Sequence, residues 1–426
     1  MSHVDVVPVN IDKVIEAGPL KVCSGTVLKL WVMISVGIIV FSAGLLFGDP
    51  GETWGAFYVN AVWFQGLALG GVMTTVIMQI VRAKWGAPVR RLAEANVAYL
   101  PVAFVVFLTT YFGREYLFYW GRHPMPGREL WMEPTFVYVR FSLLLGLLFF
   151  LMTRFVFMSL RSDVGLAHDR AKDKSKWELP IHCYLLKGWR GAEREVIPLQ
   201  RKMSVNGPIV AICYIFFVSL FAFEMIMGQN PVWFSNLFGA FIFVSQIYIA
   251  WAGLALMTMF FAKNNKEFGA QIHTQQFWDL GKLNFGFCML WGYMFWSQFL
   301  TQWYGNLPEE TQWLILRTRE FPWKGLAWLV FPMCFIIPFI TLLSRDLKKT
   351  PKTYAAVCLT LMTGVWLDRY LIIMPEVSPH HIPFGITEVG IFVGFLGAYL
   401  LCIRTFLSKF PFLQVSHPLT HGSRDW

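Results

Sequence analysis

Charged residues are scarce in this chain, and their scarcity excludes a soluble globular fold. Only 15% of the 426 residues are Asp, Glu, Lys or Arg, whereas 56% are hydrophobic and the mean hydropathy is +0.51. A soluble domain of this size carries a far more polar surface. The 40 Phe and 19 Trp residues add to the apolar content and favour helices that face lipid.

Ligand spacings for metals and haems are also lacking. None of the seven cysteines lies within four residues of another, which excludes the usual zinc, iron–sulfur and c-type haem motifs. None of the nine histidines falls in the middle of an apolar stretch, where a membrane b-type haem needs its axial ligands. We therefore predict no metal site, no covalently bound or metal-ligated cofactor and no catalytic residue of the chain's own.

Long apolar stretches are abundant, and each is a predicted transmembrane helix. A helix needs about 20 apolar residues to cross the hydrocarbon core of a bilayer. The predicted spans are 28–48, 55–81, 93–113, 135–158, 205–227, 232–262, 276–304, 325–344, 353–374 and 385–405. The fifth and sixth spans are divided at 228–231, where Gly-Gln-Asn-Pro is a strong turn signal.

Lys and Arg are concentrated in alternate loops, which predicts how the chain is oriented in the membrane. The basic loops are 82–91, 161–202, 263–266 and 345–352, and both termini carry basic residues as well. The opposite loops at 49–54, 228–231 and 375–384 contain no Lys or Arg. Both termini are therefore expected in the cytoplasm, which requires an even number of spans. The net charge of +10 reflects this bias, and we expect no nucleic-acid partner.

A weak internal repeat indicates two units of four spans. Residues 57–60 and 233–236 open the second and sixth spans with similar aromatic segments that end in Asn. Acids follow in the same order in each unit, first Glu94 and Asp279, then Glu224 and Asp368. Since four spans restore the original direction, both units would insert the same way round, as a parallel repeat.

The predicted fold is an all-α integral membrane protein of about ten transmembrane helices, with two four-helix bundles as a parallel repeat plus two flanking helices. The predicted segments are a cytoplasmic N-terminal segment 1–27, a peripheral helix 28–54, a first bundle 55–231 with a cytoplasmic loop 160–204, a second bundle 232–384, a tenth helix 385–405 and a cytoplasmic tail 406–426.

Ionisable side chains within the spans are the main candidates for function, because charge is costly inside a membrane. The candidates are Glu94, Asp279 and Lys282 toward the cytoplasmic side, and Glu224, Asp368, Arg369 and Glu388 in the outer part of their spans. One interpretation is two polar half-paths for protons, entering from opposite sides. The alternative is paired charges that orient and lock helices, and the three cytoplasmic residues could also reach the interface by snorkelling.

One segment resembles a known family. Residues 297–311, SQFLTQWYGNLPEET, resemble the signature of a membrane subunit of bacterial alternative complex III, in the NrfD-like family of ten-helix quinone-linked membrane proteins. The resemblance extends over the second to tenth spans, and that family also has two four-helix bundles.

The resemblance implies a place in a respiratory or photosynthetic electron transport chain of a bacterial inner membrane. There the complex oxidises menaquinol and reduces a periplasmic carrier such as cytochrome c. The implied partners are a sister NrfD-like quinol-binding subunit, a periplasmic iron–sulfur protein, c-type haem subunits and other small membrane subunits. Within such a complex this chain would be a non-redox subunit with a role in proton conduction. Menaquinone binding by this chain stays open, with His123 and Arg140 as candidate quinone contacts.

Two other functions remain open. Parallel repeats with buried acids also occur in stand-alone secondary transporters, although these often have matching helix breaks in both repeats, which the sequence does not show. The other alternative is the quinol-binding anchor of a different NrfD-type enzyme, such as a polysulfide reductase.

Overall fold

The computed structural model describes residues 11–20, 24–125 and 127–416, and in these residues it contains helices and no strand. The predicted terminal segments thus lie partly outside the described residues, at 1–10, 21–23 and 417–426. The principal helices are α2 (Ser24–Phe47), α3 (Pro50–Ile80), α4 (Ala87–Glu94), α5 (Leu100–Thr109), α8 (Pro134–Arg170), α10 (Ala192–Phe221), α11 (Phe238–Asn264), α13 (Thr274–Gly305), α15 (Trp323–Phe331), α16 (Ile337–Leu343), α18 (Pro351–Val377) and α19 (Ile386–Leu407). Shorter helices are α1 (Ile11–Ala17), α6 (Arg114–Leu117), α7 (Tyr119–Arg122), α9 (Pro180–Leu186), α12 (Lys266–Gly269), α14 (Pro308–Thr318) and α17 (Arg345–Lys349).

Nine helices in the described part of the chain are long and apolar enough to span a membrane. The predicted seventh span, 276–304, is not among them, although it forms the 32-residue helix α13. At 1.5 Å per residue this helix is about 48 Å long, which exceeds the hydrocarbon thickness of a bilayer. Its Gln, Asn, Trp and Tyr residues make it less apolar than the other nine. The chain is an all-α integral membrane protein, as predicted.

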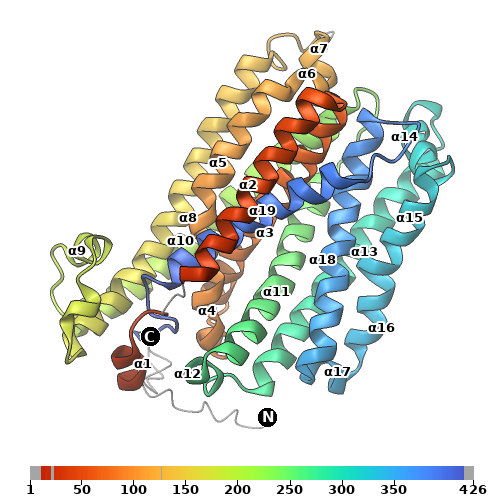
Figure 1. Ribbon diagram of the computed structural model, residues 1–426. Helices are drawn as coiled ribbons and strands as arrows, with labels where there is room; N and C mark the ends of the chain where they lie inside the picture. The colour runs from red at the N-terminus through yellow and green to blue at the C-terminus, as the bar shows by residue number, and fades with distance from the viewer. Residues whose placement is uncertain (1–10, 21–23, 126, 417–426) are drawn as a thin grey trace.

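The helices pack in two rings of four. In the first ring α3 contacts α4 and α5, α5 contacts α8, α8 contacts α10, and α10 returns to α3. In the second ring α11 contacts α13, α13 contacts α16, α15 and α16 contact α18, and α18 returns to α11 (Figure 1). We call these the first and second rings. Each ring consists of four predicted membrane-crossing segments that follow one another along the chain, in the order that the sequence repeat predicts.

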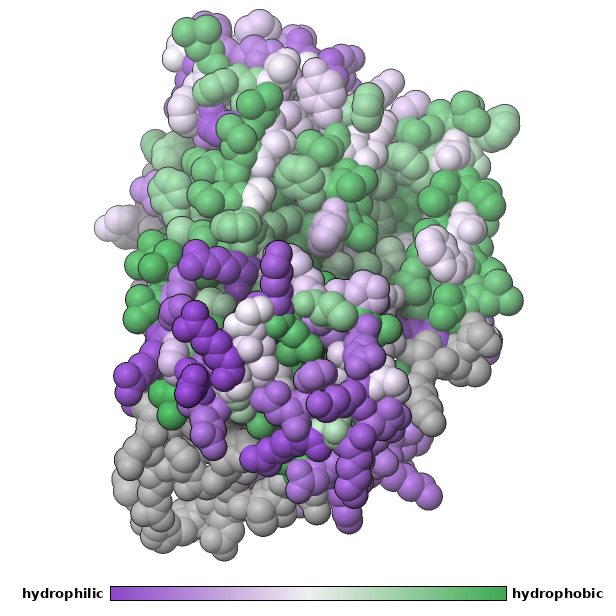
Figure 2. Space-filling model, turned by 90° about the vertical axis from the view of Figure 1, so that its left-hand side faces the viewer, coloured by the Kyte–Doolittle hydropathy of each residue, from purple (hydrophilic) through white to green (hydrophobic). Residues whose placement is uncertain are grey.

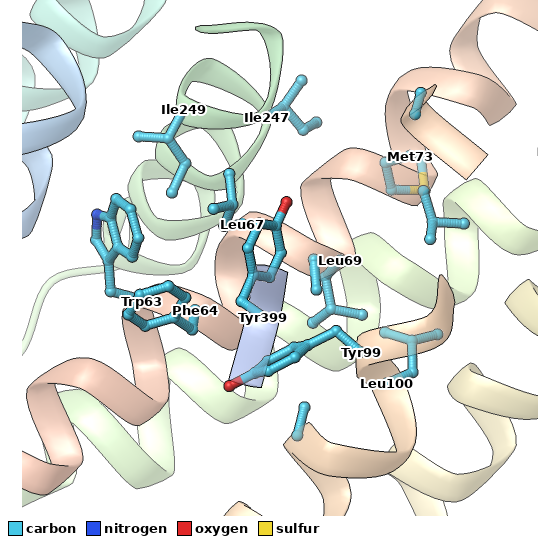
Figure 3. Close-up of a cluster of buried hydrophobic side chains, with 14 of the residues drawn as sticks. Trp63, Phe64, Leu67, Leu69, Met73, Tyr99, Leu100, Ile247, Ile249 and Tyr399 are labelled. Carbon is cyan, nitrogen blue, oxygen red and sulfur yellow. The ribbon is translucent and has the colours of Figure 1, made fainter. Parts of the chain in front are cut away.

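The two rings meet through their first helices. α3 packs along α11, and reciprocal contacts flank this pair: α3 with α18, and α11 with α10. Glycine allows the close approach, because a Cβ at Gly70 would lie 2.3 Å from the carbonyl oxygen of Gln246 on α11. A cluster of buried apolar side chains fills the surrounding space (Figure 3). α3 is consequently the most deeply buried candidate span, with 94% of its apolar window inside the protein.

Two flanking helices, α2 and α19, cross the front of the rings as a pair (Figure 1). They meet at Gly37 and Gly394, where the Cα of either glycine lies less than 3 Å from the ideal Cβ position of the other. α19 also packs on α3, whereas only 11% of the apolar window of α2 is buried. α2 is therefore exposed over most of its surface.

The surface has the polarity of a membrane protein. Figure 2 shows a hydrophobic band between a hydrophilic upper end and a larger hydrophilic lower end. α1, α9, α12 and α17 lie at the lower end in Figure 1, and α6, α7 and α14 lie at the upper end. The lower end thus gathers the loops that the sequence marks as basic. The backbone N–H of Leu20 donates to Leu407 O at 3.2 Å, so both described ends of the chain lie on one side.

The structure changes some predicted boundaries. The loop predicted at 160–204 is shorter, because α8 continues to Arg170 and α10 begins at Ala192, with α9 between them. The third span extends over Ala87–Leu117, so Arg90 and Arg91 are not loop residues. They belong to α4 and are buried, at 2% and 0% exposure.

Candidate functional site

A closed cluster of four charges lies at the lower end of the first ring. Arg91 pairs with Glu94 on its own helix and with Asp163 on α8, and Arg90 also contacts Glu94, at 3.3 Å. The four side chains are at most 3% exposed. Ser416 closes the cluster, since its backbone N–H donates to Asp163 at 2.8 Å. Glu94 is therefore a fully buried partner in an ion network and does not snorkel to the interface.

Glu224 lies near the upper end of the same ring, within a π-helical turn (η5, Ala222–Ile226) that continues α10. Arg140 on α8 pairs with its carboxylate, and the Trp131 indole N–H donates to it at 2.9 Å. The Arg140 guanidinium lies 4.0 Å from the centre of the Trp131 ring. This acid is thus held by an arginine that stacks on a tryptophan. π-Helical turns are frequent at functional sites.

The second ring has a matching arrangement, and it involves Glu376, not Asp368. Arg317 on α14 binds the Glu376 carboxylate at 2.8 Å and lies 3.8 Å from the centre of the Trp313 ring. Asn230 donates to the same carboxylate at 3.2 Å. Burial lowers the pKa of the Arg317 guanidinium from its usual value, and the adjacent carboxylate of Glu376 opposes this shift.

Apolar side chains separate the two charged ends of the first ring. Phe107, Phe141 and Phe221 meet there, with ring centres 5.7 Å apart for Phe141 and Phe221 and 6.2 Å apart for Phe107 and Phe221. All three are at most 3% exposed. The interior of the first ring is therefore polar at both ends and aromatic in between.

The second ring differs, because polar side chains recur along its interior. At its lower end Asp279 pairs with Lys282 at 2.5 Å and accepts from Gln275 at 3.1 Å. The Lys282 ammonium lies over the Trp278 ring, and its side chain is 49% exposed. This pair thus lies at the boundary between the protein interior and the lower surface.

Above this pair, four helices contribute polar groups to one column. Its members are Asn284 and Cys288 on α13, Tyr248 on α11, Cys334 in the π-helical turn η7 (Pro332–Ile336), and Tyr354 and Cys358 on α18. We call these six residues the polar column. Asn284 donates to the Tyr354 hydroxyl, and Tyr248 donates to the carbonyl of Cys334 at 3.1 Å. All six are at most 1% exposed.

Asp368 and Arg369 lie beside the upper part of the polar column, in electrostatic contact with Cys334. Asp368 Oδ2 is 3.4 Å from Arg369 Nη1, and both residues are at most 4% exposed. The sequence predicts a partner on another helix, or water, for Asp368, since consecutive residues point about 100° apart. The structure instead pairs these neighbours by ion contact without a hydrogen bond. In the described residues no hydrogen-bond partner is found for Asp368 Oδ2 or for either terminal nitrogen of Arg369.

Glu388 lies in the first turn of α19 (Ile386–Leu407), in a separate polar group at the outer end of that helix. Its carboxylate accepts from the backbone N–H of Gly385 at 2.7 Å. The Tyr370 hydroxyl lies within electrostatic range of Glu388 and Glu52, and Glu52 contacts His381 at 2.6 Å. No hydrogen-bond partner for the Tyr370 hydroxyl is found among the described residues.

The two candidate quinone contacts lie in different surroundings. His123 is exposed, and its ring centre lies 5.2 Å from that of Tyr119. Arg140 is engaged by Glu224 and by the carbonyl of Trp131, at 3.1 Å for the latter. No bond between His123 and Arg140 is found in the part of the chain that the structure describes. In that part there is also no group of three or more His, Cys, Asp or Glu side chains that could hold a metal ion.

The sequence did not single out several residues of these sites. Glu376 and Arg317 lie near predicted span ends, where charges are common, so only their spatial pairing distinguishes them. The polar column combines Asn, Tyr and Cys, residues that also occur singly in apolar helices. Their spacing did carry a signal, because Asn284 and Cys288 are four apart, as are Tyr354 and Cys358, and each pair shares a helix face.

No protein-family model and no curated protein matches this chain.

Proposed function

We propose that this protein is a non-redox membrane subunit of a quinol:electron acceptor oxidoreductase, and that its second ring conducts protons. The resemblance at residues 297–311 and the two rings of four helices support the assignment to such a complex. The lower end would then face the cytoplasm of a bacterial cell. A sister quinol-binding subunit, a periplasmic iron–sulfur protein and c-type haem subunits would carry the electrons.

The observation that carries the proton-conducting role is the unfilled hydrogen-bonding capacity inside the second ring. Asp368 Oδ2, two nitrogens of Arg369 and Asn284 Oδ1 are buried without hydrogen-bond partners among the described residues. Buried polar atoms normally find a partner, and ordered water supplies it where protein groups do not. Water at these atoms would link the lower pair at Asp279, the polar column and Asp368 into a hydrogen-bonded chain.

The first ring is less suited to this role. Its two charged clusters are paired within the protein, although Arg90 Nη2, Arg91 Nε and Arg140 Nε also lack hydrogen-bond partners among the described residues. The aromatic contact of Phe107, Phe141 and Phe221 lies between the two clusters and interrupts any polar route. We therefore assign Glu94 and Glu224 to the locking of helices and restrict the proposed proton route to the second ring. This revises the expectation of two half-paths, entering from opposite sides, that would include Glu94 and Glu224.

The test is Asp368→Asn in the native complex, reconstituted into vesicles with quinol and acceptor. The variant keeps the shape of the side chain but cannot release a proton, so we expect quinol oxidation without proton translocation. Asp346→Asn is the matched control, because Asp346 is an exposed residue of α17 outside the ring. Full proton translocation by an assembled Asp368→Asn complex would reject the route.

A second variant covers the case in which Asp368→Asn does not assemble. Tyr354→Phe removes one hydroxyl from the polar column and leaves the ring packing in place. We expect reduced proton translocation per electron from this variant, with an unchanged subunit composition. Translocation equal to that of the unmodified complex would contradict a route through Tyr354.

A further inference from the structure

A cavity of about 520 Å³ lies between α3, α11, α18 and α19. This is the size of a site for a small organic molecule. Its wall includes Trp63, Phe64 and Leu67 from α3, with Tyr399 of α19 beside them (Figure 3). Rim residues such as Leu359, which is 57% exposed, open the cavity to the lipid-facing surface. A molecule could therefore enter from the bilayer.

Aromatic rings surround one part of this cavity. The Trp366 ring centre lies 6.2 Å from that of Phe384 and 5.8 Å from that of Phe392, in edge-to-face geometry in both cases. Trp63 lies 6.1 Å from Phe392 on the other side. The Trp366 indole N–H donates to Asn60 at 3.0 Å, which fixes the orientation of this ring. Aromatic rings in this arrangement can pack their edges and faces against a flat aromatic ligand.

A single carboxylate marks the polar end of the cavity. Glu388 lines it, is 4% exposed, and uses Oε2 to accept from Gly385. The Tyr370 hydroxyl, buried and without a hydrogen-bond partner among the described residues, lies within electrostatic range of Glu388 but does not line the cavity. The polar end therefore offers the Glu388 carboxylate as a hydrogen-bond acceptor.

The charge of the lining selects against anionic lipids. Glu388 is acidic, Glu52 lies close to the same Tyr370, and neither Lys nor Arg lines the cavity. A phosphate or fatty-acid carboxylate would meet like charge in a medium of low dielectric constant. An uncharged head that donates a hydrogen bond would satisfy Glu388 instead.

We propose that this cavity binds a lipid-soluble hydroquinone, with its ring among Trp366, Phe384 and Phe392, one hydroxyl donating to Glu388, and its chain extending toward Leu400. The preference for an uncharged, hydroxyl-bearing aromatic head follows from the lining. The identification of that head as a quinol rests on the proposed function. This site is separate from His123 and Arg140, which do not line the cavity.

The test measures binding of menaquinol-4 to the isolated chain in nanodiscs by native mass spectrometry, under reducing conditions. We expect one bound molecule. Glu388→Gln keeps the contact to Gly385 but loses the charge, and should weaken binding about tenfold, the effect of one charge-assisted hydrogen bond. Leu396→Trp fills the cavity and should abolish binding. Leu147→Trp, on the lipid-facing side of α8 and outside the cavity, is its matched control.

The outcomes separate the proposals. Equal menaquinol binding by the unmodified chain and by Leu396→Trp would overturn the site. Equally tight binding of phosphatidylglycerol, displaced by Leu396→Trp, would show a lipid-chain site and overturn the selection for a hydroquinone. Because the assay uses no electron transfer, absence of binding would leave the proposed proton route intact. Loss of proton translocation in Asp368→Asn likewise says nothing about this cavity.

Discussion

Replacing Arg91 with Met should remove a large part of the stability of the first ring. Arg91 joins Glu94 to Asp163 on α8, and all three side chains are 0% exposed. Without it, one guanidinium, that of Arg90, remains for two carboxylates. Breaking a buried ion pair from one side costs about 3–5 kcal/mol. We expect the lower end of that range, because Ser416 still donates to Asp163.

The measurement is the unfolding free energy in mixed micelles, obtained by titration with dodecyl sulfate. Lys172→Met is the control, because the Lys172 side chain is 87% exposed in its pair with Glu16, and we expect no measurable change. The double variant Arg91→Met with Asp163→Leu should recover part of the loss, since it removes a carboxylate together with its partner. A loss below about 1 kcal/mol for Arg91→Met, the range of exposed pairs, would refute the reasoning.

Three further predictions use single positions. Gly70→Ala should destabilise the protein by about 1–3 kcal/mol, because its Cβ would overlap the carbonyl of Gln246, while Gly146→Ala, which points into open space, should be neutral or slightly stabilising. An equal effect of both glycine variants would contradict this packing. Burial lowers the pKa of His182 below its usual 6.5; the neutral ring therefore contributes stability above about pH 6.5 that is lost as the pH falls. Unfolding measured between pH 8 and 5 should show this slope, and His182→Gln should flatten it. A cysteine at residue 202 should react with an impermeant maleimide only from the cytoplasmic side, and labelling from outside would reverse the proposed orientation.

The sequence predicted the fold more fully than the sites. Span lengths and loop charges depend on properties that each residue carries alone. Nine of the ten predicted spans are accordingly long and apolar enough to cross a membrane in the described residues, and both described ends lie on one side. A buried ion pair, in contrast, can be predicted only if both residues, often far apart in the sequence, are known to meet. Nothing in the segment around Arg91 indicates that it meets Asp163, 72 positions later. The positive-inside bias even assigned Arg90 and Arg91 to a loop, because composition cannot separate a buried guanidinium from a solvated one.

The sequence repeat placed acids at corresponding positions of the two units, but these acids do not have corresponding neighbours in the structure. Counting along the chain places Asp368 opposite Glu224, and both are acids in the fourth helix of a ring. In space, Glu376 has the arrangement of Glu224, with an arginine stacked on a tryptophan. The arginine that pairs with Glu224, Arg140, belongs to the long helix α8. The arginine that pairs with Glu376, Arg317, belongs to the short connecting helix α14. The two arrangements therefore correspond in space but not in their positions along the chain.

The central position of α3 has a consequence for the synthesis of the protein. Asn60 accepts a hydrogen bond from the indole N–H of Trp366, a residue that is translated 306 residues later. At about 5–20 residues per second, that partner is missing for roughly 15–60 s after α3 has left the ribosome. During this interval local bonds satisfy two of its polar side chains, since Asn60 donates to Ala56 at 2.8 Å and Thr74 donates to Gly71 at 2.7 Å. The second helix to enter the membrane can therefore wait in lipid, with Asn60 and Thr74 already donating within their own turns, until the last helices enclose it.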